Sequence, residues 1–557
     1  MDSVFGREEG KLHGYPGHEI AEMALVRLYE TTGERRYLDL ARYFVTERGR
    51  SPLYFEAEDR RRAELDGTAV EPNTNLPKPY AYYQAHEPVV EQTEAVGHAV
   101  RAAYFYSGVA DVARLTGDSD LLAACDRLWR NIVDRKLYIT GGIGGTHIGE
   151  AFSYDYDLPN DTAYSETCAA IALAFFARRM LQIRPVSEYA DVMELALYNT
   201  VLAGMAMDGK SFFYVNPLEV DPTACHRDER KFHVKSVRQK WFGCACCPPN
   251  IARIVESIQQ YATTVSDDSS TLYIHLYMGG EATVELGGRD VTLVMDANLP
   301  WQGDGRAVVR ITDGADLPAT RIVSGGTGHA EVGPDGTSAV SGPDESDESD
   351  TSANATVTAT LAFRLPSWAG GEAAADAIRV EGAAGSRLSR EVRDGYLYLT
   401  GEWRDGDTVT FDFPMPVRML AANPNVREDA GKVAFMRGPV TYCAEGIDNG
   451  AALHLLHVDA AAVAADPDAV RIERTGFHAG AEGLDERGTG EVESVERDIV
   501  RLTVPGWRES GDVRSVTGGP LYAAWHPAER ESASITLIPY FAWANRGETE
   551  MTVWLRV

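Results

Sequence analysis

The sequence predicts a multidomain α+β protein in which a helical toroid or solenoid precedes two β-sandwich domains. Three observations lead to this fold class. The 557 residues exceed what one hydrophobic core usually holds, so we expect two to four domains. Apolar residues recur at helical spacing in the first half, and they alternate at strand spacing in the second half. We place the domains at residues 1–263, 264–420 and 421–557.

The first half contains repeated helical hairpins. In residues 17–49, apolar residues follow a three- and four-residue spacing on both sides of a Thr-Gly break, and residues 94–134 repeat that arrangement. Two further helices are expected within 166–183 and 188–205, and another within 251–258. About seven helices are therefore predicted before the β-rich half, in the arrangement of a helical toroid or solenoid.

The second half reads as strands. From about residue 265 the segments alternate, are rich in β-branched and aromatic residues, and are separated by Gly-Gly turns. This pattern is typical of β-sandwiches. Within it, residues 333–354 are polar, acidic and of low complexity, so we expect a disordered loop between strands.

Charge and composition exclude several classes of protein. The formal net charge is −30 and the pI is about 4.8, which argues against nucleic acids and anionic membranes as partners. The scarcity of lysine and the acidic surface suggest a halophilic protein, the alternative being an ordinary acidic cytosolic one. No apolar run is long enough to cross a membrane, and no secretory signal is visible at the start, so we expect a cytoplasmic location.

Three of the seven cysteines lie in "GCACCPPN" (residues 243–250), directly before a predicted helix. We expect Asn250 to cap that helix. Thiols at a helix N-terminus tend to ionise, and the adjacent thiolates of Cys246 and Cys247 repel each other unless a cation lies between them. A soft metal, most simply zinc, is therefore expected. The role of Cys244 is left open, and isolated free thiols are expected at Cys125, Cys225 and Cys443.

A second helix start supplies further ligands. "YSETCAA" places Glu166 and Cys168 two residues apart. Together with Cys246 and Cys247 they would form a four-coordinate site of one oxygen and three sulfur ligands. From the residues alone, a purely structural zinc site, or four merely structural residues, is an equally good reading.

Several motifs together resemble one family. The chain is similar, over nearly its whole length, to the β-L-arabinofuranosidase-type enzymes of glycoside hydrolase family 127, the former DUF1680 group. The motifs that carry this resemblance are "GHAVRAAYF", "TGGIGGTHIGEAF", "SETCA", "FFYVNPLE" and "GCACCPPNIAR". The resemblance implies an (α/α)6-type toroid followed by two β-sandwiches. Because the family has a further upstream segment with another pocket histidine, we expect this toroid to be incomplete at the N-terminus.

The family's chemistry, carried over to matching positions, assigns roles to five residues. Cys246 would be the nucleophile, and Glu150 would be the general acid and then the general base. Glu166, Cys168 and Cys247 would hold a zinc ion together with Cys246. This is a retaining double displacement with a thiolate in place of the usual second carboxylate.

The same resemblance implies a sugar pocket. His98, His18 and Tyr214 match residues that line the pocket or lie beside the nucleophile. His147 could point into the pocket or only cap its turn, and His86 is expected near the site without a named role. The glycines of residues 141–145 are expected to permit a tight turn, since no phosphate-binding Lys-Ser/Thr pair follows them.

The predicted function is that of a retaining glycosidase that removes terminal β-L-arabinofuranosyl or similar furanosyl residues. Two alternatives stay open at this point. One is a carboxylate-only glycosidase of another sugar with structural zinc, and the other is an inactive carbohydrate-binding homologue. The expected partners are an oligosaccharide or small-molecule substrate and a second copy of the chain in a homodimer.

Overall fold

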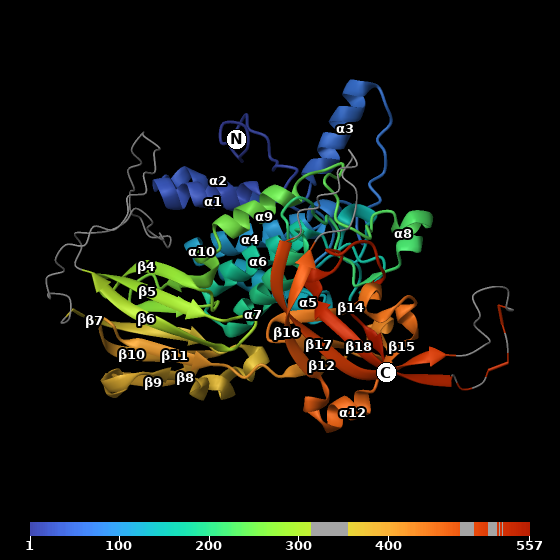
Figure 1. The fold of residues 1–557 in the computed structure, drawn as a ribbon. Helices are drawn as coiled ribbons and strands as arrows, with labels where there is room; N and C mark the ends of the chain where they lie inside the picture. Colours follow the sequence, from blue (N-terminus) through green and yellow to red (C-terminus); the bar gives the residue numbers. More distant parts are fainter. Residues whose placement is uncertain (313–354, 480–494, 511–520, 523, 526, 528) are drawn as a thin grey trace, which may run out of the picture.

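The computed structural model describes residues 1–312, 355–479, 495–510, 521–522, 524–525, 527 and 529–557. Three regions follow one another along the chain: a helical region (1–262), a middle region (263–415) and a C-terminal region (416–557) (Figure 1). The predicted mixture of helices and sheets in several domains is confirmed. The acidic segment 333–354, predicted to be a disordered loop, lies outside the described residues.

The helical region contains two pairs of consecutive helices, each pair joined at a glycine. Its α-helices are α1 (Ala21–Thr32), α2 (Arg35–Glu47), α3 (Tyr54–Asp66), α4 (Ala99–Thr116), α5 (Ser119–Arg135), α6 (Thr167–Ile183), α7 (Ser187–Ala196), α8 (Pro222–Arg227), α9 (Cys247–Glu256) and α10 (Gln259–Ala262). The sequence predicted about seven helices here, and α3, α8 and α10 were missed. In α3 only Phe55 and Ala63 are buried, so the apolar period that reveals a helix is absent.

The glycines at the two Thr-Gly breaks end their helices by turning left-handed. Gly33 and Gly117 have φ of 71° and 66°, and their backbone N–H groups bond to the carbonyls of Tyr29 and Ala113. Such a left-handed cap is nearly free of steric cost for glycine alone. Asp118 then caps α5 through its side chain, so both predicted helical hairpins are present.

Helices α4 and α6 form the centre of the helical region. Both are buried on almost every side, as expected for helices that are surrounded by other elements. They pack against each other, and α9 packs on α6. The start of α6 is thereby held beside the start of α9.

The middle region consists of two five-stranded sheets that enclose one core. The strand orders are β2-β3-β7-β10-β9 and β4-β5-β6-β11-β8. The strands are β2 (Thr263–Val265), β3 (Thr271–Ile274), β4 (Gly280–Leu286), β5 (Arg289–Ala297), β6 (Asp304–Thr312), β7 (Thr356–Arg364), β8 (Ile378–Val380), β9 (Leu388–Arg393), β10 (Tyr396–Arg404) and β11 (Thr408–Asp412). Alternate residues from both sheets, among them Leu293 and Leu399, meet in the shared core.

The C-terminal region forms a ten-stranded sheet that includes one strand from the helical region. Its order is β1-β19-β14-β18-β17-β15-β20-β13-β12, with β16 paired to β17. The strands are β1 (Glu219–Val220), β12 (Val417–Leu420), β13 (Lys432–Arg437), β14 (Val440–Glu445), β15 (Leu456–Val458), β16 (Arg471–Ala479), β17 (Val495–Ser510), β18 (Glu529–Pro539), β19 (Met551–Thr552) and β20 (Leu555–Arg556). The short helices α11 (Gly446–Asn449) and α12 (Ala460–Ala465) flank this sheet.

Both β-rich regions make side-chain contacts with the helical region. Phe213 stacks on Trp543 with ring centres 4.6 Å apart, and the Arg238 guanidinium donates to the Trp543 carbonyl at 2.6 Å. In the middle region, the fully buried Arg364 forms ion pairs with Asp191 and Glu194 of α7. The segment around residue 213 is thus held in place by contacts with the C-terminal region. No helix among the described residues is long and apolar enough to cross a membrane.

Candidate active site

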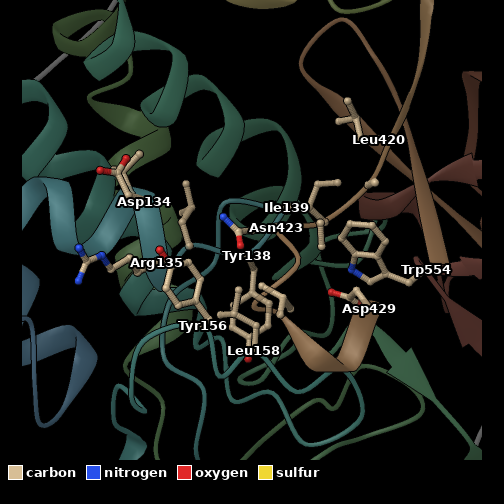
Figure 2. Close-up of a pocket in the computed structure, with 15 residues that line it drawn as sticks. Asp134, Arg135, Tyr138, Ile139, Tyr156, Leu158, Leu420, Asn423, Asp429 and Trp554 are labelled. Atoms are coloured by element: carbon tan, nitrogen blue, oxygen red, sulfur yellow. The ribbon is translucent and has the colours of Figure 1, made fainter. Parts of the chain in front are cut away.

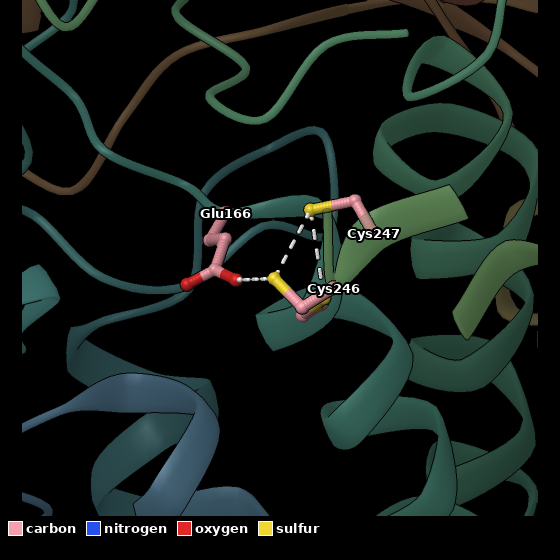
Figure 3. Close-up of side chains that lie close together, drawn as sticks. Glu166, Cys246 and Cys247 are labelled. Carbon is pink, nitrogen blue, oxygen red and sulfur yellow. Dashed lines mark hydrogen bonds between the residues drawn. The ribbon is translucent and has the colours of Figure 1, made fainter. Parts of the chain in front are cut away.

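Four side chains that can bind a metal meet where two helices begin. Glu166 is the N-cap of α6 and Cys168 lies in its first turn, whereas Cys246 is the N-cap of α9 and Cys247 is its first residue. The packing of α6 on α9 brings the two starts together (Figure 3). One ligand atom from each residue lies within 4.8 Å of the others. The structure therefore gathers all four residues that the sequence predicted as metal ligands.

The local backbone geometry before and within the two helix starts positions these four side chains. Two prolines stand in the first turn of α9, where proline's fixed φ favours the helix and its missing N–H costs nothing. Before α6, Ser165 has a φ of 39°, which is unfavourable for a residue with a side chain. A bridge between Glu166 and Val215 holds this turn in place.

The spacing of the cluster suits a four-coordinate cation. The Cys168 and Cys247 sulfurs are 3.5 Å apart, and those of Cys246 and Cys247 are 3.8 Å apart. The Cys246 sulfur is 3.5 Å from Glu166 Oε1. A tetrahedral zinc with metal–sulfur bonds of about 2.3 Å and metal–oxygen bonds of about 2.0 Å has edges of roughly 3.8 Å and 3.5 Å. Within the described residues, Glu166 Oε2 is buried without a hydrogen-bond partner, so the carboxylate has unused ligand capacity.

Negative charge in the cluster concentrates on one sulfur. The Cys168 and Cys247 thiols lower the pKa of the Cys246 thiol well below its usual range. Burial, reinforced by the charge on Cys246, raises the pKa of Glu166 well above its usual range. Cys246 is half-buried whereas Cys247 is fully buried. Cys246 is therefore the more accessible of the two adjacent sulfurs.

Asn250 does not cap α9, contrary to the prediction. The helix begins at Cys247, four residues before the predicted start at Ile251, because its proline pair supports the first turn. Asn250 instead lies inside the helix, where its amide donates to the Cys168 sulfur at 2.9 Å and to the Tyr104 hydroxyl at 3.0 Å. Its side chain thus contributes a hydrogen bond to the cluster that the spacing in the sequence did not reveal.

Glu150 lies on a tight turn beside the cluster. Gly149 and Glu150 both have left-handed φ, 71° and 52°, and in a residue with a side chain this costs on the order of 1–2 kcal/mol. Bridges from Ala151 to Thr146 and to His98 hold the turn. The Glu150 side chain is one-third exposed, so it can reach a ligand.

Two hydrogen bonds fix the Glu150 carboxyl. The His98 Nε2 lies 2.9 Å from Oε2, and the Tyr164 hydroxyl donates to Oε1 at 2.8 Å. His98 Nδ1 accepts from the Arg101 backbone N–H, so Nε2 carries the proton and donates. Burial raises the pKa of Glu150, but the hydrogen bonds from His98 and Tyr164 outweigh it and lower the pKa overall.

The two parts of the site share Glu166. Ligand atoms of His98, Glu150 and Glu166 lie within 4.8 Å of one another, and Glu166 also contacts Cys246. Tyr214 closes the other side, because its hydroxyl oxygen lies 3.5 Å from the Cys246 sulfur, within hydrogen-bond distance. Glu150 and Cys246, the two predicted catalytic residues, thus flank one carboxylate.

The remaining predicted residues are His18, His147 and His86, of which only the first two lie near this centre. Partial desolvation and the Arg101 guanidinium lower the pKa of the exposed His18 to about 4, so its ring is neutral near pH 7. His147 is exposed, and its side chain makes no capping hydrogen bond to the turn. Its ring stacks instead on that of His233, with the ring centres 4.5 Å apart and an angle of 18° between the ring planes. His86 pairs with Glu87, and no described contact joins it to the site.

Further residues of the site were not foreseen. Tyr164 and His233 line the Glu150 side of the cluster, and their rings are 5.9 Å apart. Only the position of Tyr164, two residues before Glu166, could have drawn attention to it. Gly141 has a φ of 75°, and a side chain there would meet the Ala196 backbone at 2.5 Å, which agrees with a turn role for the glycine-rich segment. Cys125, Cys225 and Cys443 are free and buried, and Cys244 is free and exposed.

A separate hollow of about 280 Å³ lies between the helical and C-terminal regions (Figure 2). Apolar and aromatic side chains such as Leu158, Tyr138 and Trp554 line it together with Asp429. Burial raises the pKa of Asp429 to about 6. The predicted catalytic and metal-binding residues are absent from the described lining, so this hollow is distinct from the candidate site.

Family models match almost the whole chain. The model described as the β-L-arabinofuranosidase, GH127 catalytic domain matches residues 1–260. The model of the β-L-arabinofuranosidase, GH127 middle domain matches residues 271–415, and that of the glycoside hydrolase family 127 C-terminal domain matches residues 417–556.

Individual proteins show the same similarity. A non-reducing end β-L-arabinofuranosidase from Bifidobacterium longum subsp. longum is 37% identical over 559 residues, which cover 100% of this chain and 73% of that protein. The crystal structure of Ara127N-Se, a GH127 β-L-arabinofuranosidase from Geobacillus stearothermophilus T6, has 39% identity and a TM-score of 0.79, over 100% of this chain and 74% of the other. The GH127 β-arabinofuranosidase BT3674 has 33% identity and a TM-score of 0.70, and the match covers 100% of this chain and 71% of the other.

Proposed function

The chain belongs to glycoside hydrolase family 127 and is a hydrolase of glycosidic bonds, and we propose that it removes terminal β-L-arabinofuranosyl residues, or similar furanosyl residues, with retention of configuration. The arrangement of Cys246 and Glu150 on either side of Glu166 is the observation that carries this proposal. A nucleophile and an acid must both reach the anomeric centre in a double displacement. The names of similar proteins, two of which are β-L-arabinofuranosidases, supply the sugar.

Cys246 is the nucleophile in this proposal. Its sulfur is half-buried and lies 3.5 Å from the Tyr214 hydroxyl, and the neighbouring Cys168 and Cys247 thiols lower its pKa. It attacks the anomeric carbon while the bond to the leaving oxygen breaks, which gives a thioglycosyl intermediate. Water then displaces the sulfur from the opposite face, so the two inversions restore the original configuration.

Glu150 moves the protons. Protonated, it donates to the leaving oxygen in the first step, and as a carboxylate it takes a proton from water in the second. The hydrogen bonds from His98 and Tyr164 strengthen as the carboxyl loses its proton. In the first step these interactions therefore stabilise the transition state more than the protonated ground state, which accelerates that step.

Glu166, Cys168, Cys246 and Cys247 would hold a zinc ion. Bound there, zinc would keep the thiols ionised near neutral pH. Within the chain itself, Asn250 orients Cys168 through its hydrogen bond to the sulfur, and Glu166 and Tyr214 hold Cys246. We further propose that His18, His98 and Tyr214 line the pocket of the furanosyl ring, and that His147 lies on the leaving-group side of this pocket, where its ring stacks on His233.

The remaining expectations from the sequence belong to the same proposal. They are the toroidal arrangement of the helices, the two β-sandwiches with the first boundary at residues 263/264, a homodimer, a halophilic surface and a cytoplasmic location. The second predicted boundary, at residues 420/421, would separate β12 from the C-terminal sheet in which it pairs with β13, so we place this boundary before β12. The shared core of the two five-stranded sheets supports the first sandwich.

The first experiment measures release of sugar from an aryl β-L-arabinofuranoside, with bound zinc quantified on the same sample. Turnover with about one zinc per chain supports the proposal, and zinc-loaded protein without turnover on any furanoside contradicts it. Cys246→Ser separates the two enzyme mechanisms. We expect it to lose nearly all turnover, whereas a carboxylate-only glycosidase with structural zinc would keep most of it.

A further inference from the structure

We propose that His147 and His233 form a binding subsite for the leaving group, and that the leaving group it fits is a second sugar residue. This inference rests on the proposed function, since it takes Glu150 as the general acid. Neither histidine belongs to the cysteine cluster. His233 in particular was not singled out from the sequence.

The position of the pair follows from that of Glu150. A general acid must touch the oxygen of the leaving group, so whatever is attached to that oxygen lies beside the residues that flank the carboxyl. His147 begins the turn that ends at Glu150, and its carbonyl accepts the Glu150 N–H at 3.3 Å. On the other flank, Tyr164 donates to Glu150 and has its ring 5.9 Å from that of His233. The two imidazoles therefore stack next to the acid.

The ring nitrogens of the pair are suited to hydroxyl groups. His233 Nε2 lies 3.2 Å from the Thr162 carbonyl, which can only accept, so Nε2 carries the proton and Nδ1 presents a lone pair. Within the described part of the chain, no group hydrogen-bonds to the imidazole of His147, which is exposed. Together the rings can accept from one hydroxyl and donate to another. Burial lowers the pKa of His233, which keeps the stacked pair from carrying two charges.

Apolar side chains neighbour both histidines along the chain. Ile148, next to His147, is 75% exposed, and Phe232, next to His233, is 47% exposed. Both side chains are thus available to a ligand that reaches the stacked rings. A sugar ring has both C–H faces and hydroxyls, so it uses the apolar neighbours and the ring nitrogens at once. A plain aryl group would leave the nitrogens unpaired.

The test compares leaving groups on one glycosyl donor. His147→Ala and His233→Ala are assayed on a β-L-arabinofuranosyl disaccharide and on p-nitrophenyl β-L-arabinofuranoside. We expect kcat/KM for the disaccharide to fall about tenfold, the worth of one or two hydrogen bonds, and that for the aryl glycoside to change less than about twofold. His233→Asn, which keeps a donor and an acceptor, should recover most of the loss. His478→Ala, at a side chain 70% exposed in the C-terminal region, is the matched control.

A second readout bypasses the first step. With the aryl glycoside as donor and L-arabinose as acceptor, the intermediate divides between water and the sugar. In the transfer, a hydroxyl oxygen of the acceptor bonds to the anomeric carbon, the carbon–sulfur bond breaks, and Glu150 takes the hydroxyl proton. The ratio of transfer to hydrolysis should fall about tenfold in both alanine variants, because they lose hydrogen bonds to the acceptor sugar. Glu150 deprotonates both water and the sugar, so a change in its activity affects both reactions equally and leaves the ratio unchanged.

The outcomes separate this inference from the proposed function. If both substrates lose equal activity and the transfer ratio is unchanged, the pair only supports Glu150, and the inference is wrong. It is also wrong if the wild-type chain cleaves the aryl glycoside but not the disaccharide. If the chain instead cleaves a different furanoside, the sugar assigned above is wrong, and the same ratios are measured on that donor.

Discussion

Tyr164→Phe is the change that most sharply tests how the site works. It removes one hydroxyl, which donates to Glu150 Oε1 at 2.8 Å, and leaves the buried ring in place. A hydrogen bond to a charged group contributes about 1.5–3 kcal/mol. In the protonated Glu150 that acts as the acid, this bond strengthens as the proton leaves, so most of that energy should appear in the transition state of the first step. At about 1.4 kcal/mol per tenfold change in rate, kcat/KM should fall roughly 10- to 150-fold.

The assay is steady-state kinetics on a β-L-arabinofuranoside with a poor leaving group, beside a matched variant. Tyr138 is also a buried tyrosine, but its hydroxyl donates to the Pro159 carbonyl at 3.1 Å, away from Glu150. Tyr138→Phe should cost about 1 kcal/mol of stability at most and leave kcat/KM unchanged. Equal kinetics for Tyr164→Phe and wild type, or equal losses in both variants, would refute the reasoning.

Three further predictions concern proton transfer and stability. Glu150→Gln should lower kcat/KM about 10²- to 10⁴-fold for a poor leaving group and far less for an activated aryl one; a uniform loss would remove its role as acid. His275 is buried and hydrogen-bonded to Tyr396 and Thr264, and burial lowers its pKa to about 3. Because the unfolded state takes up the proton below about pH 6.5, the stability from this shift is complete above that pH and is lost as pH falls toward 3. Urea unfolding should therefore show a loss of about 2 kcal/mol between pH 7 and 5 that His275→Gln lacks; parallel pH profiles would contradict this. Arg364→Met removes the ion-pair partner of the buried Glu194 and the half-buried Asp191 and should cost about 3–5 kcal/mol in the same assay, whereas an unchanged midpoint would show that the pairs contribute nothing.

The four candidate metal ligands could be predicted because their spacing in the sequence encodes local chemistry. Adjacent thiols before a proline pair, and a Glu-x-Cys at another helix start, each point to a helix N-terminus that favours anions. The two helical hairpins were equally visible, since apolar spacing and Thr-Gly breaks are local signals. The meeting of the two helix starts, by contrast, depends on the packing of α6 against α9, and only the family resemblance indicated it.

What the sequence could not reveal depends on contacts between distant segments. His233 reaches His147 across 86 positions of the chain, and no periodic pattern marks such a pair. Asn250 looked like a helix cap because asparagine favours that position, yet the proline pair starts the helix one turn earlier. Helix α3 was missed because charged residues cover most of it.

The most direct test of the account is to find the covalent intermediate. The chain would be quenched in acid during steady-state turnover of an aryl β-L-arabinofuranoside, and its peptides mapped by mass spectrometry. The account predicts one pentosyl unit on the peptide that contains Cys246, located to that sulfur by fragmentation and absent from Cys246→Ser. A pentosyl unit on a carboxylate such as Glu166, or turnover with inversion and no adduct, would contradict it.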